Sequence, residues 1–210
     1  SISRPAMVAA VVIRRTTRRT ARTFSEASFA SAAASPPPWK VLHIMNQGQW
    51  KSEAVRLFPV TTAIVQSLPS LLNKCIFGNV FFSHVQQGSG IPPHCGPTNI
   101  RHRLHLALKV VAGSSSATTT ATTTFDSRPR LLVRETVHYW TESRAFCFDD
   151  SLRHAVEYPM NNNKSSSLHS SSSSSSTTLE KERIVLIVDL WHPDLSEAER
   201  SAVQDLYPAI

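Results

Sequence analysis

Apolar and polar side chains alternate most regularly between residues 100 and 108. Arg101, Arg103 and His105 occupy one set of alternate positions, with His102 as the single interruption. Four apolar side chains occupy the other set: Ile100, Leu104, Leu106 and Leu108. A period of two predicts an extended strand with one basic face and one core face. Because two arginines and a histidine are costly against an apolar layer, we expect the basic face to line a wet cavity that holds an anion.

Short apolar stretches on both sides of this strand predict further strands. They lie at residues 80–85, 131–133, 137–140, 145–148 and 184–188. The last is a continuous apolar run, which is typical of a strand buried on both faces. Earlier in the chain, Val60, Ile64 and Leu68 recur every four residues. This pattern starts behind Pro59 and ends at Pro69, so it predicts a helix that packs across one side of the core. Short strands and few helices after residue 79 favour a sandwich or barrel.

Three segments differ in composition from the rest of the chain. Residues 1–38 are rich in Arg, Ser, Thr and Ala, and fit either an organelle-targeting segment or a disordered tail. Residues 113–124 and 161–178 are low-complexity inserts of small polar side chains, which we expect to form loops. One folded domain is therefore expected over residues 39–210. The chain starts with Ser1 rather than Met, so a fragment of a longer, membrane-anchored protein is an open alternative.

The charge distribution narrows the class of protein. The formal net charge is +7, but residues 1–38 hold six arginines and one glutamate, which leaves +2 for the remainder. The sequence after residue 38 shows no run of basic residues that would form a basic surface on the folded domain, so we expect no nucleic-acid partner. The apolar run at residues 6–13 is far shorter than the roughly 20 residues of a membrane span, and none is expected. The three cysteines, Cys75, Cys95 and Cys147, lack CxxC spacing and are expected to be free thiols.

Three sequence blocks, taken in order, resemble a known enzyme family. The first runs from Phe82-Ser83 through His94-Cys-Gly-Pro-Thr-Asn and Arg101-His-Arg-Leu-His, the second covers residues 148–154, and the third residues 183–193. Together they resemble the aspartyl/asparaginyl β-hydroxylases, which are Fe(II)- and 2-oxoglutarate-dependent dioxygenases. The resemblance spans residues 39–210. It narrows the mainly β fold to a double-stranded β-helix, a jelly roll of the cupin kind, with a flanking N-terminal helix.

The resemblance implies that His94 and His154 bind Fe(II) and are the catalytic pair. Many non-haem iron oxygenases add a carboxylate two residues after the first histidine, but here that position is Gly96. The resembled family works with two histidines and leaves the third position to water. Asp149 and Asp150 are interpreted as groups that orient the loop around His154.

The same resemblance assigns the remaining site residues. Arg183 and Ser83 are implied to anchor the distal carboxylate of 2-oxoglutarate, and His105 to contact the cosubstrate near the metal. Arg101 and Arg103 are implied to bind the acidic or amide side chain of the substrate. The structural alternatives are a strand-end arginine that reaches solvent at position 183 and surface arginines on an edge strand at 101 and 103.

The implied reaction hydroxylates the β-carbon of Asp or Asn in a protein or peptide, consumes O2, and releases succinate and CO2. Two alternatives stay open. One is the same chemistry on a fatty-acyl or small-molecule substrate. The other is a jelly-roll binding module without catalysis, which the Ser-rich insert before Arg183 motivates.

Overall fold

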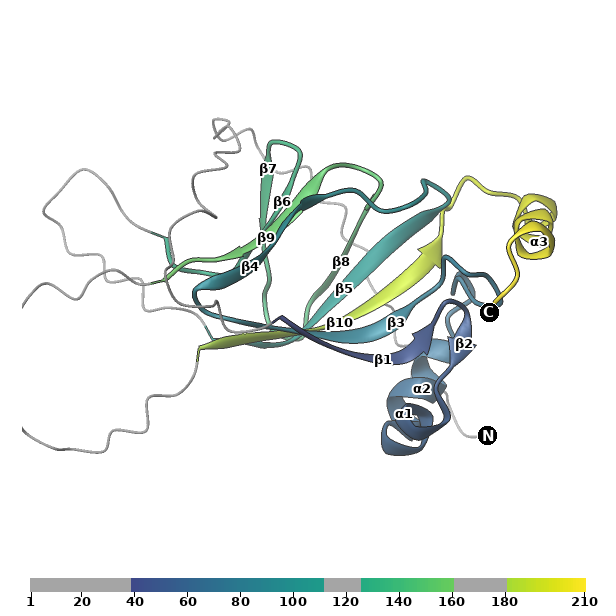
Figure 1. Cartoon of the computed structure of the whole chain (residues 1–210), viewed down its shortest axis with the longest axis horizontal. Helices are drawn as coiled ribbons and strands as arrows, with labels where there is room; N and C mark the ends of the chain where they lie inside the picture. The colour runs from purple at the N-terminus through teal and green to yellow at the C-terminus, as the bar shows by residue number, and fades with distance from the viewer. Residues whose placement is uncertain (1–38, 112–125, 161–180) are drawn as a thin grey trace, which may run out of the picture.

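The strands of the chain form two antiparallel sheets, and the computed structural model describes residues 39–111, 126–160 and 181–210. The larger sheet has the strand order β2-β1-β3-β10-β5-β8 and the smaller β4-β9-β6-β7 (Figure 1). The strands are β1 Lys40–Asn46, β2 Gln49–Trp50, β3 Val80–Gln86, β4 Ser89–His94, β5 Arg101–Val110, β6 Arg130–Val133, β7 Thr136–Tyr139, β8 Ala145–Phe148, β9 His154–Tyr158 and β10 Glu182–Trp191. The helices of these residues are α1 Ser52–Leu57, α2 Pro59–Gln66 and α3 Glu197–Leu206. The predicted segments 1–38, 113–124 and 161–178 lie outside the described residues.

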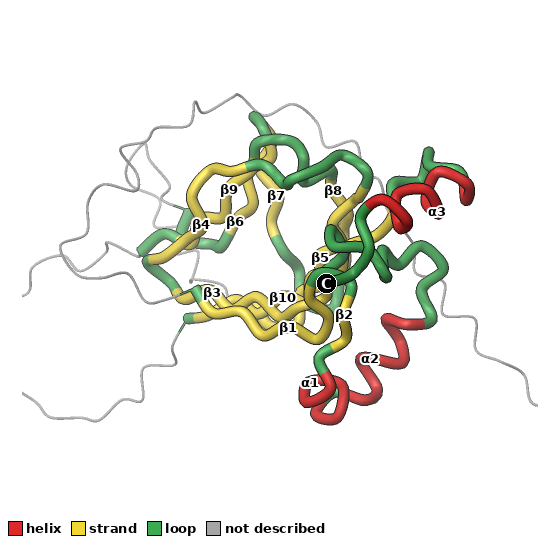
Figure 2. The backbone as a smooth tube through the Cα atoms, turned by 45° about the vertical axis from the view of Figure 1, so that its right-hand side comes forward, coloured by secondary structure: helices red, strands yellow, loops and turns green. Residues whose placement is uncertain are grey.

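The two sheets face each other and enclose one core (Figure 2). From β3 onward the chain crosses repeatedly between the sheets, because β3, β5, β8 and β10 belong to the larger sheet and β4, β6, β7 and β9 to the smaller. Buried side chains of both sheets contact each other there, among them Val85, Ala107, Leu131, Val156 and Val185. This is a double-stranded β-helix of the cupin kind, and the predicted fold is confirmed.

The outer face of the larger sheet carries the α1–α2 hairpin. Ile44, Val80 and Leu186 form its buried centre, and Phe58 of the hairpin packs against Phe82 at a ring distance of 4.9 Å. The predicted helix after Pro59 is confirmed, but its predicted packing face is wrong. Val60 and Ile64 point to solvent, whereas Thr62 and Val65 are buried. The spacing of four identified the helix without identifying which side contacts the sheet.

The strand with the regular alternation is β5, and its two faces differ from the expectation. Arg101 and His105 are each 3 % exposed and point into the space between the sheets. Leu104 and Leu106 contact the outer cluster only as half-buried residues, and Leu108 is exposed. The basic face is therefore the more deeply buried one. Charged side chains on this buried face need partners within the protein, and these partners come from segments far away in the sequence.

Candidate functional site

The two predicted metal ligands lie side by side between neighbouring strands. His94 ends β4 and His154 begins β9, and the antiparallel register pairs them directly. Their ring centroids are 4.2 Å apart with the planes tilted by 54°. His154 is buried, whereas His94 is exposed. The structure thus brings together two imidazoles that are sixty positions apart in the chain.

Both rings are oriented in the same way by the backbone. Nδ1 of His94 lies 2.8 Å from the carbonyl oxygen of Pro92, and Nδ1 of His154 lies 2.8 Å from that of Leu152. A ring that donates from Nδ1 carries its free lone pair on Nε2, which is the arrangement of metal-binding histidines. Burial lowers the pKa of His154, the Leu152 carbonyl opposing this only in part, so its neutral form, the one that binds metals, is favoured.

A carboxylate ligand has no place at position 96. A Cβ atom on Gly96 would collide with the carboxylate of Asp150, and the Gly96 N–H donates to the Asp150 carbonyl at 2.6 Å. Throughout the described residues, no group of three or more His, Cys, Asp or Glu side chains is arranged to hold a metal. The fit to a metal therefore rests on the two imidazoles. Asp150 contacts the loop that follows His94, and its predicted role of orienting the loop around His154 stays a prediction.

Arg101 and Arg103 meet two buried aspartates rather than a wet cavity. Arg101 donates to both carboxylate oxygens of Asp150, at 3.2 and 2.7 Å, and to Asp189 at 3.0 Å. Its guanidinium also contacts the carbonyl of Phe77. Arg103 donates to Asp189 at 2.8 and 3.2 Å, and its side chain stays 14 % exposed. The expected wet cavity is thus replaced by protein carboxylates at Arg101. Substrate contact by either arginine stays a prediction.

Arg183 is the buried charge without a counter-charge. It is 0 % exposed, and its described contacts include no carboxylate. Nη2 donates to Ser83 Oγ at 2.8 Å, and the guanidinium lies 4.4 Å from the ring centroid of Trp140. Nε and Nη1 have no hydrogen-bond partner within the described part of the chain. Burial lowers the pKa of Arg183 to about 9, so the side chain is still cationic at neutral pH. The predicted alternative of a solvent-reaching arginine is wrong, since no part of it is exposed.

His105 presents a second unsatisfied donor in the same interior. The Trp140 indole donates to His105 Nδ1 at 3.4 Å, so the proton of the neutral ring is on Nε2, which has no partner in the described residues. Burial, with Arg183, Arg103 and His154 nearby, lowers the pKa of His105 well below its ordinary value. The ring contacts Phe148 at 5.1 Å, and Phe148 in turn contacts His154 at 5.2 Å. His105 therefore lies between the buried cation and the histidine pair.

Sequence reasoning missed two tryptophans of this site. The Trp39 indole donates to Ser83 Oγ at 3.0 Å, and Trp140 covers Arg183. Because Ser83 Oγ already accepts from both Trp39 and Arg183, its own hydroxyl proton is free to be donated to a ligand. Trp39 is the first residue after the proline-rich end of segment 1–38, a position that could have marked it. Trp140 carries no such signal.

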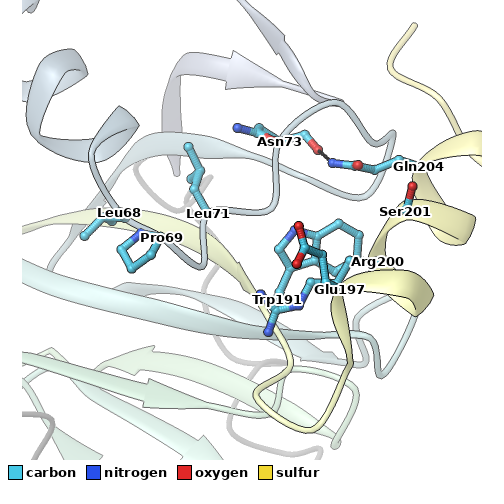
Figure 3. A pocket seen from close by; sticks show the side chains of 9 residues that line it. All are labelled: Leu68, Pro69, Leu71, Asn73, Trp191, Glu197, Arg200, Ser201 and Gln204. Carbon is cyan, nitrogen blue, oxygen red and sulfur yellow. Dashed lines mark hydrogen bonds between the residues drawn. The ribbon is translucent and has the colours of Figure 1, made fainter.

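A separate hollow of about 510 Å³ lies between α3 and the turn that follows α2 (Figure 3). Its walls include Leu68, Trp191, Arg200 and Gln204, and the Gln204 side chain donates to the Asn73 carbonyl at 3.0 Å. None of the predicted site residues lines it. The candidate site is therefore the interior between the sheets, from the histidine pair to Arg183.

Comparison with known proteins gives one family. The family model described as Aspartyl/Asparaginyl beta-hydroxylase matches residues 9–193. Human "Aspartate beta-hydroxylase domain-containing protein 2" is 31% identical over 169 residues, covering 80% of this chain and 37% of that protein. Human "Aspartate beta-hydroxylase domain-containing protein 1" is 28% identical over 196 residues, covering 89% and 42%. Human "Aspartyl/asparaginyl beta-hydroxylase" is 26% identical, covering 79% and 17%. The chain thus spans less than half the length of these relatives.

Several solved structures that overlap with the chain are named as cupins. A Cupin 2 conserved barrel domain protein from Salinispora arenicola overlaps with a TM-score of 0.36 at 9% identity, covering 80% of this chain and 85% of that one. A cupin superfamily protein from Desulfitobacterium hafniense gives a TM-score of 0.34 at 8% identity, covering 85% and 99%. The fold assignment rests on the strand order described above, not on these distant overlaps.

Proposed function

Because the chain belongs to the aspartyl/asparaginyl β-hydroxylase family, we propose that it is an Fe(II)- and 2-oxoglutarate-dependent hydroxylase. The observation that carries this proposal is Arg183. A fully buried guanidinium with two unpartnered nitrogens, and no carboxylate among its described contacts, is expensive unless an anion joins it. The same interior holds two imidazoles whose Nε2 atoms are free to bind a metal.

The residues present fit the proposed cofactors. Imidazole nitrogens suit iron, and His94 and His154 would hold it through Nε2. Bound Fe(II) with 2-oxoglutarate supplies the oxidising power that hydroxylates an unactivated C–H bond with O2, releasing succinate and CO2. The protein supplies position and a dry interior. Leu152 and Pro92 fix the two rings, and the 3 % exposure of His154 limits water on its side.

Three groups form the proposed anchor for the cosubstrate. Arg183 can give a bidentate pair of charge-assisted hydrogen bonds to a carboxylate from Nη1, which has no partner in the described residues, and from the second N–H of Nη2, beside the one that binds Ser83. Ser83 can add its hydroxyl proton, because its lone pairs already accept from Trp39 and Arg183. His105 can donate from Nε2 between this anchor and the metal ligands. A dicarboxylate lying from Arg183 toward the histidines would satisfy all three.

The proposed substrate is an Asp or Asn residue of a protein or peptide. His94 is exposed, so the metal end of the site opens toward solvent, where a peptide can approach. Arg103 keeps 14 % of its side chain exposed and is the better placed of the two predicted substrate-binding arginines. Arg101 would first have to release Asp150 or Asp189.

Anaerobic titration with Fe(II) and then 2-oxoglutarate tests the proposal. The expected result is a metal-to-ligand charge-transfer band that saturates at one equivalent of each. Candidate peptides that contain Asp or Asn are then added with O2, and succinate is measured. Absence of the band contradicts the proposed cofactors. A band without succinate for any substrate class favours the non-catalytic binding module.

A further inference from the structure

The α1–α2 hairpin presents apolar side chains to solvent. Leu57, Val60 and Ile64 are 59 %, 71 % and 54 % exposed, although the same hairpin buries Ala54, Thr62 and Val65 against the sheet. Leu42 of β1, 46 % exposed, is on the same outer face of the sheet: it pairs with Phe82, which contacts Phe58 of the hairpin. We call Leu42, Leu57, Val60 and Ile64 the hairpin face. Several large apolar side chains exposed on one element of this kind indicate an interaction site.

The charges around the hairpin face have one prevailing sign. Residues 57–73 contain no Asp, Glu, Lys or Arg at all. Residues 40–56 carry Lys40, Lys51 and Arg56 against the single carboxylate of Glu53, and all four are exposed. The preceding residues 1–38 add six arginines and one glutamate, and they join the chain at β1. An uncharged apolar centre bordered by cations is complementary to a surface that is apolar inside and anionic outside.

The hairpin face lies away from the candidate site. In Figure 1, α1 and α2 lie outside the larger sheet, on the opposite side from β4 and β9, which carry the histidine pair. Figure 2 shows the same arrangement after a turn of 45°. Whatever covers the hairpin face therefore leaves the interior between the sheets open.

We propose that the hairpin face binds the surface of an anionic phospholipid bilayer. Val60, Ile64, Leu57 and Leu42 enter the interface, while Lys51, Arg56 and Lys40 meet lipid phosphates. The hairpin lies on the bilayer and does not cross it: α2 spans eight residues, and among the described residues no helix is long and apolar enough to span a membrane. This surface is independent of the proposed hydroxylation and would orient the site toward the aqueous side.

Vesicle binding by the full 210-residue chain tests this proposal. We expect sedimentation with phosphatidylcholine vesicles that contain phosphatidylserine, and weaker binding to phosphatidylcholine alone. Val60→Glu with Ile64→Glu should weaken binding by at least about tenfold, because two side chains that would enter the interface become charged. Val137→Glu with Met160→Glu is the matched control: both side chains are exposed, the charge change is equal, and they lie on β7 and just after β9, across the larger sheet from the hairpin. The control should bind within about twofold of the unmodified chain.

A second measurement separates the hairpin face from the arginines of residues 1–38. Tryptophan placed by Val60→Trp should shift its emission to the blue on vesicle addition, whereas tryptophan placed by Val137→Trp, on the smaller sheet, should not. Equal vesicle binding by the unmodified chain and the Val60→Glu, Ile64→Glu variant would overturn the proposal, because the N-terminal arginines then suffice. So would a concentration-dependent dimer that this variant dissolves, since a second copy would then cover the face.

Discussion

At Arg183, one side chain combines complete burial, a charge and two nitrogens without a hydrogen-bond partner among the described residues. Buried charges in proteins are normally paired, as Arg101 and Arg103 are by Asp150 and Asp189. The two paired arginines lie on β5 and Arg183 lies on the neighbouring strand β10, so all three enter the same interior. The paired arginines hold the fold together, and the unpaired one is the proposed receptor for an anion.

Replacing Arg183 by Met should weaken 2-oxoglutarate binding by at least about a hundredfold, because two charge-assisted hydrogen bonds are lost. Binding of Fe(II) to the histidine pair should be unchanged. Calorimetric titration of the iron-loaded protein measures both. Arg144→Met, at an exposed position, is the control and should bind like the unmodified chain. Unchanged affinity in Arg183→Met would place the anchor elsewhere.

His154→Ala removes one of two proposed ligands, so the charge-transfer band and succinate release that accompany 2-oxoglutarate should both disappear. His138→Ala removes an imidazole that stacks on Phe146 at 5.9 Å, outside the proposed ligand pair, and should keep the band. Circular dichroism checks that both variants are folded. Full turnover by His154→Ala would exclude His154 as an essential ligand.

At the scale of elements, the aspartates hold the site-bearing segments in register. Asp189 of β10 accepts hydrogen bonds from Arg101 and Arg103 of β5 and also from Asn79 just before β3. Asp150 ties β5 to the loop after β4 and precedes β9 by four residues. Asp189 and Asp150 therefore link the five strands that carry the predicted site residues, which are β3, β4, β5, β9 and β10.

Asp189→Asn should lower the free energy of unfolding by about 3–5 kcal/mol, since two buried guanidinium groups then share the single carboxylate of Asp150 and one buried positive charge is left uncompensated. Asp126→Asn removes the carboxylate of a partly exposed pair with Arg128 and should cost about 1 kcal/mol or less. Urea denaturation of both variants measures the difference. Similar losses in the two would mean that the buried network contributes no more than a surface pair.

At the scale of the whole molecule, burial of histidines makes the fold sensitive to acid. Burial is the main cause that lowers the pKa values of His43, His102, His105, His138 and His154. Below the ordinary histidine pKa of about 6.5, these histidines bind protons in the unfolded chain that they do not bind in the folded chain. Stability from these groups is therefore complete above that pH and is lost as the pH falls below it.

The free energy of unfolding should thus decrease between about pH 7 and pH 5, with each histidine contributing a slope of up to about 1.4 kcal/mol per pH unit. His105→Gln should reduce this slope by about one histidine's share, because it removes an imidazole whose pKa burial holds well below its ordinary value. Urea denaturation at a series of pH values gives the slopes. A slope that His105→Gln leaves unaltered would mean that His105 is protonated in the folded state.

The sequence by itself determined the strands around residues 80–85, 131–133, 145–148 and 184–188 and the helix after Pro59, because period and proline position act locally. The cupin-like fold was implied by the family resemblance of its motifs. Its motifs also identified His94, His154, Ser83, His105 and Arg183 as candidates. Only the tertiary structure decided which buried arginines find a carboxylate, which face of α2 meets the sheet, and that Trp39 and Trp140 border Arg183. These depend on contacts between segments up to about a hundred residues apart, and a local pattern carries no record of which distant side chain will supply the partner.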